Sequence, residues 1–144
     1  MINMVVRVRL RIRRNDKVID TSALANSGYE AETPQLLIPI KLARLLNLWP
    51  PKGESETVFE TAGGPLRVWI VPKACKIKVI TEDTESPEVI VDIVISPLAD
   101  EVLLSDKLIS ELQIALEDVG RGIWRFRWEP KEKVRYSEPP KYWK

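Results

Sequence analysis

The chain has 144 residues, of which 44% are hydrophobic and 30% charged, and its formal net charge is +1. This length suits one compact domain, and the apolar content excludes a disordered chain. The near-zero net charge gives no overall field for binding nucleic acid, and no stretch approaches the run of about 18 apolar residues that spans a membrane. The single Cys75 excludes an internal disulfide, and the N-terminus lacks the apolar core of a signal peptide. We therefore expect a cytoplasmic protein.

Histidine is absent from the sequence. Serine and cysteine triads that use an imidazole base are therefore excluded, as are most catalytic zinc sites. The glycine-rich phosphate-binding patterns GxxxxGK[ST] and GxGxxG are also missing. We expect neither a cofactor nor a metal, so any catalysis would rest on carboxylate, hydroxyl, lysine or tyrosine groups.

The N-terminal third predicts a β-hairpin followed by a short helix. Apolar residues alternate with arginines between Val6 and Arg13, which is the period of a half-buried strand, and a turn at Asn15-Asp16 leads into a second strand over 17–25. Pro39 is well suited to start a helix that ends before Pro50. The residues expected on its buried face are Ile38, Leu42, Leu45 and Leu46.

The rest of the chain predicts more short strands and one more helix. Strands are expected over 57–61 and 66–71, joined by a glycine-tipped turn, and over 74–80 and 88–95, joined by an acidic loop around 82–85. A short strand at 102–104 precedes a helix with Ser105 as its N-cap. Its expected buried residues are Leu104, Leu108, Ile109 and Leu112, and strands follow over 114–117 and 123–128.

This order of elements predicts an all-β domain, a small closed β-barrel with two short helices. The barrel domain is expected over residues 1–128. Residues 129–144 are charged and contain prolines, so we expect them to form a loose tail.

Four motifs follow one another along the chain. The first is the stretch ALANSG at residues 23–28, at the end of the second expected strand and followed by Tyr29. The second is Ile38-Pro39, before a helix that ends in Leu46-Asn47-Leu48. The other two are a glycine-tipped hairpin, Thr61-Ala62-Gly63-Gly64, and the apolar strand Val102-Leu103-Leu104-Ser105 with the closing segment 120–126. In this order the motifs resemble the single-domain retropepsin-like aspartic proteases of bacteria and archaea, in which the hairpin is a flap, and the resemblance extends over residues 5–126.

The resemblance implies a homodimer in which each chain contributes half of a cleft, with an extended peptide as ligand. In the family the position of Asn26 carries an aspartate, and two aspartates share one proton and activate a water. Asn26 cannot act as acid or base, whereas Ser27 and Gly28 keep the hydroxyl and the close backbone approach of the loop. Leu103, Leu104 and Ser105 would lie behind this site, with Ser105 where the family usually has glycine.

Three functions stay open at this point. The first is an inactive, dimeric peptide-binding or interaction module. The second is an active aspartic peptidase, either through Asp20, although Asp20-Thr21-Ser22 lacks the glycine of the motif, or through a mixed dimer with an Asp-bearing relative. The third is an anion or nucleic-acid binder that uses the arginines of residues 7–14. A stripe of charge on an edge strand usually only prevents aggregation, so we do not expect nucleic acid as a partner.

Three further features have structural interpretations. Cys75 is expected to be a buried apolar residue, because no activating base is visible. The acidic loop around 82–85 is expected to be solvated. Trp124, Phe126 and Trp128 alternate on one strand face, where they are expected to contact the core or a second copy.

Overall fold

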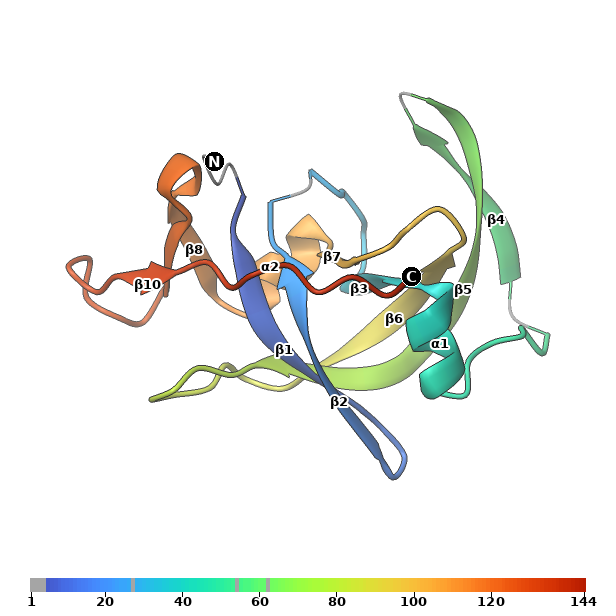
Figure 1. The fold of residues 1–144 in the computed structure, drawn as a ribbon, viewed down its shortest axis with the longest axis horizontal. Coiled ribbons are helices and arrows are strands. Elements are labelled where there is room, and N and C mark those ends of the chain that lie inside the picture. Colours follow the sequence, from blue (N-terminus) through green and yellow to red (C-terminus); the bar gives the residue numbers. More distant parts are fainter. Residues whose placement is uncertain (1–4, 27, 54, 62) are drawn as a thin grey trace.

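The computed structural model describes residues 5–26, 28–53, 55–61 and 63–144, without the side chains of residues 55, 60 and 61. Most of its elements follow the order expected from the sequence, and two short strands, 35–39 and 135–136, were not expected (Figure 1). They are β1 (Arg7–Arg14), β2 (Lys17–Leu24), β3 (Gln35–Pro39), α1 (Ile40–Leu45), β4 (Ser55–Thr61), β5 (Gly64–Val79), β6 (Val89–Ser96), β7 (Val102–Leu104), α2 (Asp106–Glu111), β8 (Ile114–Asp118), a 3₁₀ turn (Val119–Arg121), β9 (Ile123–Phe126) and β10 (Arg135–Tyr136).

Six strands close into a barrel, which confirms the expected fold class. The strand order is β1-β2-β7-β3-β6-β5, and a further pairing of β5 with β1 completes the ring. The β2–β7 and β3–β6 pairs are parallel and the others antiparallel. A separate three-stranded sheet, β10-β9-β8, lies at one end.

Strand β1 shows how the sequence pattern builds the core. Val8, Leu10 and Ile12 are fully buried, and the arginines between them lie on the outer face. However, β1 is not the edge strand that its charged face suggested, because it pairs with β2 on one side and with β5 on the other. The arginine stripe therefore has no free backbone edge to protect.

Strand β5 is one continuous element where two strands were expected. Its 16 residues pair with β4 at one end and with β1 at the other. The register against β6 shifts between Val71 and Cys75, and Lys73 in this bulge has φ +48°. The Lys73 N–H donates to Asp92 Oδ1 on β6 at 2.9 Å. Because a bulge increases local twist, β5 can turn from one part of the barrel wall to the next without interruption.

Both helices form, and the expected buried face of the first differs from the structure at two residues. Ser105 caps α2 by accepting a hydrogen bond from the Leu108 N–H, as predicted. In α1, Leu42 and Leu46 are fully buried, but Leu45 is 48% exposed and Ile38 belongs to β3 rather than to the helix. The helix has only six residues, so a narrow apolar face is enough to pack it on the barrel.

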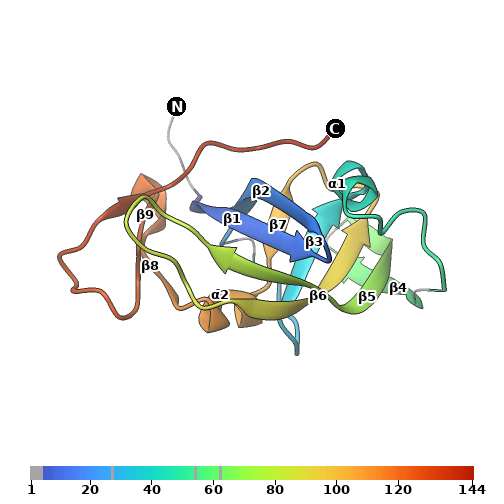
Figure 2. The same cartoon turned by 90° about the horizontal axis from the view of Figure 1, so that it is seen from below.

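The C-terminal segment is packed against the barrel, whereas the sequence predicted a loose tail. The Glu138 N–H donates to the Arg7 carbonyl at 2.8 Å, and the indole N–H of Trp143 donates to Thr21 Oγ1 at 3.0 Å. Figure 2 shows the segment running from β10 across the barrel towards α1. Strand β9 ends at Phe126, two residues before the expected end at Trp128. The Trp128 side chain is 47% exposed, and its ring stacks on that of Phe126 with 4.3 Å between the ring centroids.

Candidate functional site

The loop that begins at Asn26 lies where β2 ends. Leu24 pairs in parallel with Leu103 of β7, so the barrel places Leu103 and the residues after it beside this loop. Two hydrogen bonds join Val6 to this region. The Ala25 N–H donates to the Val6 carbonyl at 2.9 Å, and Asn26 Oδ1 accepts from the Val6 N–H at 2.8 Å. The side chain of Asn26 thus extends the β1–β2 ladder by one hydrogen bond.

Of the two residues that follow, Ser27 lies outside the described residues, and Gly28 is exposed. Gly28 has φ +74°, a left-handed conformation that side chains disfavour, so the loop turns here at little cost because the residue is glycine.

The following residues of the loop are held by the start of α2. Ser105 is fully buried, and its Oγ accepts from the Gln35 N–H at 3.0 Å as well as from the Leu108 N–H at 3.2 Å. The Asp106 N–H donates to the Tyr29 carbonyl at 2.7 Å, and the Tyr29 hydroxyl donates to Gln35 Oε1 at 2.5 Å. Burial raises the pKa of Tyr29 above its usual range, so the phenol remains a neutral donor. The sequence predicted Ser105 as the N-cap, and the structure adds its second role as acceptor for the Gln35 N–H.

A second apolar cluster lies on the outer face of the barrel wall. On β3, Leu36 and Ile38 belong to the main core, whereas Leu37 between them points to the opposite face. The same alternation places Val94 of β6 outside, between Ile93 and Ile95. The second apolar cluster comprises Leu37, Val68 and Val94, with Tyr29, Phe59, Leu66, Ile70, Ala99 and Leu103 packed against them.

An arm formed by β4 and the first part of β5 projects from the barrel (Figure 1). Thr61 pairs with Gly64, which has φ +109°, so a two-residue connection forms its tip. This is the position of the expected flap; Gly63 is exposed, and Ala62 lies outside the described residues. Within the described chain β4 pairs only with β5, which leaves the other edge of β4 open.

The arm and the Asn26 loop meet through two aromatic rings. Tyr29 lies three residues after Asn26, and its ring centroid is 6.4 Å from that of Phe59 on β4. Phe59 in turn pairs with Leu66 across the arm. The second apolar cluster therefore joins three parts that sequence reasoning had placed near one site: the loop, the hairpin and Leu103.

Asp20, the alternative catalytic residue, lies in the middle of β2 and is held by two arginines. Its carboxylate accepts from Arg11 Nε at 2.8 Å and Nη2 at 3.0 Å, and from Arg9 Nη2 at 3.3 Å. The hydrogen bonds from Arg11 are the main cause that lowers the pKa of Asp20. A carboxylate stabilised in its charged form in this way is a poor base, and its geometry is that of a structural ion pair.

Several other charged groups also have structural partners, and the single thiol is buried. Arg7 forms a two-pronged pair with Glu101, with 2.7 and 3.2 Å between the guanidinium nitrogens and the carboxylate oxygens. Cys75 is buried as expected, and burial raises its pKa to about 11. In the acidic loop, Asp83 accepts hydrogen bonds from Arg135 and Lys133. Among the residues that the structure describes, no group of acidic and cysteine side chains is arranged to hold a metal ion.

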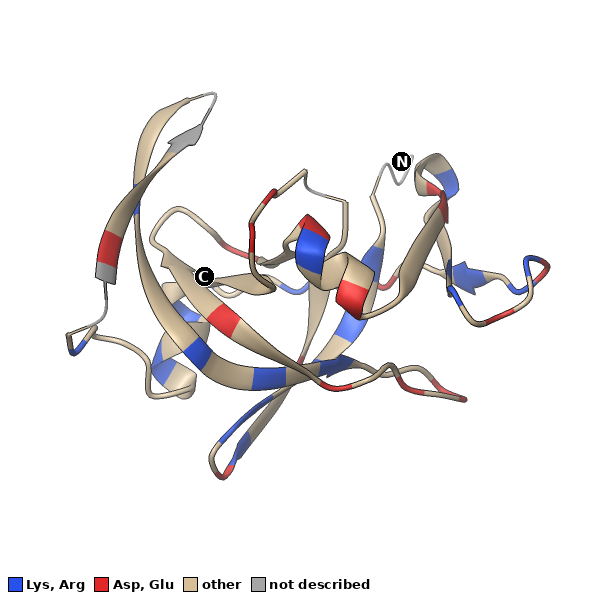
Figure 3. Ribbon diagram, turned by 180° about the vertical axis from the view of Figure 1, so that it is seen from behind, with Lys and Arg blue, Asp and Glu red and all other residues tan. Residues whose placement is uncertain are grey.

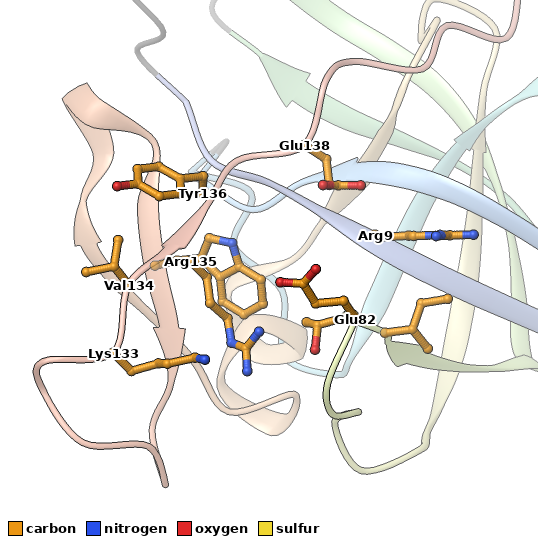
Figure 4. Close-up of a pocket in the computed structure, with 10 residues that line it drawn as sticks. Arg9, Glu82, Lys133, Val134, Arg135, Tyr136 and Glu138 are labelled. Atoms are coloured by element: carbon orange, nitrogen blue, oxygen red, sulfur yellow. The ribbon is translucent and has the colours of Figure 1, made fainter.

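A pocket of about 400 Å³ lies between the C-terminal sheet and the barrel (Figure 4). Arg9, Lys133 and Arg135 line it together with Glu82 and Glu138. These charges are of both signs, and none of the residues expected at the site lines it. We therefore assign the candidate site to the Asn26 loop and the second apolar cluster.

The sequence reasoning missed the second apolar cluster, although a signal for it was present. The stretches Leu36–Ile38 and Val89–Ile95 are almost uninterrupted runs of apolar residues. A strand with one solvated face alternates, so an unbroken run indicates that both faces are covered. The residues that cover the outer face come from the loop after Asn26 and from the arm.

Comparisons with known proteins give no relative: no family model matches the chain, and no curated protein matches its sequence. None of the helices in the described ranges is long and apolar enough to cross a membrane.

Proposed function

We propose that this chain is a retropepsin-like domain without peptidase activity that binds an extended peptide between the arm and the Asn26 loop. The observation that carries the proposal is the position of Asn26. It follows the strand β2, beside Leu103 of β7, on a loop that contacts the arm through Tyr29 and Phe59. In an aspartic protease of the proposed type the residue at this position is the carboxylate that activates water.

Asn26 has no group that can accept a proton from water at working pH. General acid–base assistance of this kind contributes on the order of 10²–10⁴ in rate. Asp20, the other candidate carboxylate, is engaged by Arg9 and Arg11. The proposal therefore assigns to the site a binding role.

Peptide binding is supported by the open edge of β4 and the apolar cluster next to it. An extended segment can add to a free strand edge through backbone hydrogen bonds, while its side chains bury apolar surface beside the strand. The second apolar cluster offers that surface, and its partly buried members include Tyr29, Phe59 and Leu103. An apolar, weakly charged segment of a few residues fits this chemistry best.

We further propose that two copies associate so that their Asn26 loops face each other, because the family builds one cleft from two chains. Light scattering at micromolar concentration tests this part, and a mass of one chain would contradict it.

The missing activity is tested by restoring the carboxylate. Freshly purified protein, with the Asn26 amide verified by intact mass, should not cleave an unfolded protein between pH 3 and 7. The Asn26→Asp variant should gain cleavage at acidic pH, since a carboxylate oxygen can still accept the Val6 hydrogen bond. It should also be less stable near neutral pH, because two carboxylates would then face each other in the dimer.

The control for this test is Asn26→Ala, which should stay inactive. Cleavage by the intact-amide protein that persists in Asn26→Ala would refute the proposal and make Asp20 the residue to test.

The binding role is tested with a pool of unstructured twelve-residue peptides and amide NMR. Peptides that bind should shift the amides of β4 and of Tyr29. Phe59→Ala should weaken this binding at least fivefold, because Phe59 packs on the second apolar cluster. Val58→Ala is the matched control: Val58 is the neighbour on the same strand, but it is 52% exposed and does not join the cluster. Equal losses in both variants, or shifts remote from β4, would contradict the proposed site.

A further inference from the structure

A basic pocket lies where the tip of the β1–β2 hairpin meets the bulge of β5, away from the residues of the proposed peptide site. Its volume is about 410 Å³. The lining side chains include four cations and no carboxylate, in a chain whose net charge is only +1. In Figure 3, blue segments lie along the curved part of β5 and recur on the hairpin next to it. The pocket is lined by Arg13, Arg14, Asn15, Lys73, Ala74, Cys75, Lys76 and Ile90.

The strand register places like charges directly opposite each other here. Arg13 of β1 pairs with Lys76 of β5, and like charges at such positions are destabilising. Glu88 neutralises the charge of Arg13 alone, with 3.3 Å between Arg13 Nη1 and Glu88 Oε2. Among the described residues, the ammonium groups of Lys73 and Lys76 form no ion pair with a carboxylate, although the Lys73 backbone N–H donates to Asp92. A bound anion would relieve this repulsion.

Arg14 forms a fixed wall of the pocket. Its Nε donates to the Leu46 carbonyl at 3.1 Å, and its Nη1 donates to the Ala74 carbonyl at 3.0 Å. A guanidinium group has five N–H donors, so three remain for a ligand, in an orientation that is already set. Preorganisation of this kind lowers the entropy cost of binding.

Lys73 occupies a backbone conformation that normally favours glycine or asparagine. Its φ is +48°, a conformation that is strained for a lysine. The same bulge that requires this conformation brings Lys73 and Lys76 to one rim of the pocket. A strained cationic residue at the rim of a basic pocket is consistent with a site for an anion.

We propose that this pocket binds a small ligand with a multiply charged phosphate group, of the size of a diphosphate or a nucleoside diphosphate. The volume admits such a group, and Ile90, which is 53% exposed, offers an apolar contact beside it. A nucleic-acid strand is a poorer match, because the arginines that would extend the surface along β1 are occupied: Arg11 by Asp20 and Arg7 by Glu101.

Calorimetry with inorganic pyrophosphate on the full chain tests the proposal. We expect saturable binding with a dissociation constant below 1 mM that weakens as NaCl rises, since salt screens exposed charges. Amide NMR should place the shifts at residues 13–15 and 73–76. The double variant Lys73→Gln/Lys76→Gln should weaken binding at least tenfold. Both side chains are exposed, so the variant should keep the urea midpoint of the parent protein.

The matched control is Lys107→Gln/Lys131→Gln, which removes the same charge from two other exposed lysines and should change the affinity less than twofold. Equal losses in the two double variants would overturn the proposal. A single-stranded oligonucleotide that binds more tightly than pyrophosphate and retains its affinity in Lys73→Gln/Lys76→Gln would also overturn it, as would the absence of saturable pyrophosphate binding.

Discussion

Arg135 joins the C-terminal sheet to the barrel, and its removal should be the most costly single change in the C-terminal segment. Its side chain is only 7% exposed and forms two hydrogen bonds with Glu129, at 2.9 and 2.6 Å, and one with Asp83 at 2.8 Å. The guanidinium also lies over the rings of Trp124 and Phe126, at 5.9 and 5.4 Å from their centroids.

The expected cost follows from what Arg135→Met leaves behind. Glu129 is 11% exposed and would keep its charge with only the hydrogen bond from the Phe126 N–H, and the loss of one partner from a buried ion pair costs about 3–5 kcal/mol. The bond to Asp83 adds little, because Asp83 is 50% exposed. We expect a loss near the lower end, about 3 kcal/mol, since methionine preserves part of the apolar packing. With a urea m-value of about 2 kcal/mol/M, the unfolding midpoint should fall by roughly 1.5 M.

The pH dependence separates the lost charge pair from lost packing. Hydrogen bonds from Arg135 lower the pKa of Glu129 in the folded protein. A lowered pKa contributes stability that is present above the unfolded value of about 4.3 and is lost as the pH falls through the folded value. In Arg135→Met the main cause of this lowered pKa of Glu129 is absent, so the variant loses less stability than the parent protein as the pH falls. The difference in unfolding free energy between the two proteins should therefore shrink between pH 7 and pH 3.

The assay is urea denaturation followed by tryptophan fluorescence, with Arg121→Met as the matched control. Arg121 is 79% exposed and lies 3.6 Å from Asp118, so this control should change stability by less than about 0.5 kcal/mol. Two results would refute the stabilising role of the Arg135–Glu129 ion pair. One is that Arg135→Met destabilises the protein no more than Arg121→Met at pH 7. The other is that its loss of unfolding free energy is the same at pH 3 as at pH 7.

Two further experiments, one substitution and one measurement of thiol reactivity, test other parts of the fold. Ser105→Ala should cost about 1–2 kcal/mol in urea denaturation, because it removes the N-cap of α2 and leaves the Gln35 N–H without its side-chain acceptor; an unchanged midpoint would contradict this role. The Cys75 thiol should react with iodoacetamide at pH 8 at least 100-fold more slowly in the folded protein than in urea, because it is 3% exposed and burial raises its pKa to about 11; comparable rates in the two conditions would show that the thiol is accessible.

Local patterns in the sequence predicted most of the secondary structure. The alternation of apolar residues with arginine identified β1, and Ser105 before an apolar helical stripe identified α2 and its cap. The glycines at 63 and 64 located the tip of the arm. These features depend on a few neighbouring residues, so period, capping and turn chemistry suffice to find them. The closed barrel followed from the number and order of short strands.

Partners that are far apart along the chain could only be found in the tertiary structure. The position of β1 inside the ring depends on its pairing with β5, more than 60 residues away. The packing of the C-terminal segment depends on contacts such as Trp143 with Thr21, and the Arg135 pair depends on Asp83. Even the role of Asn26 in the ladder depends on Val6. A side-chain period specifies which face of a strand is buried, but it carries no information about which distant segment covers that face.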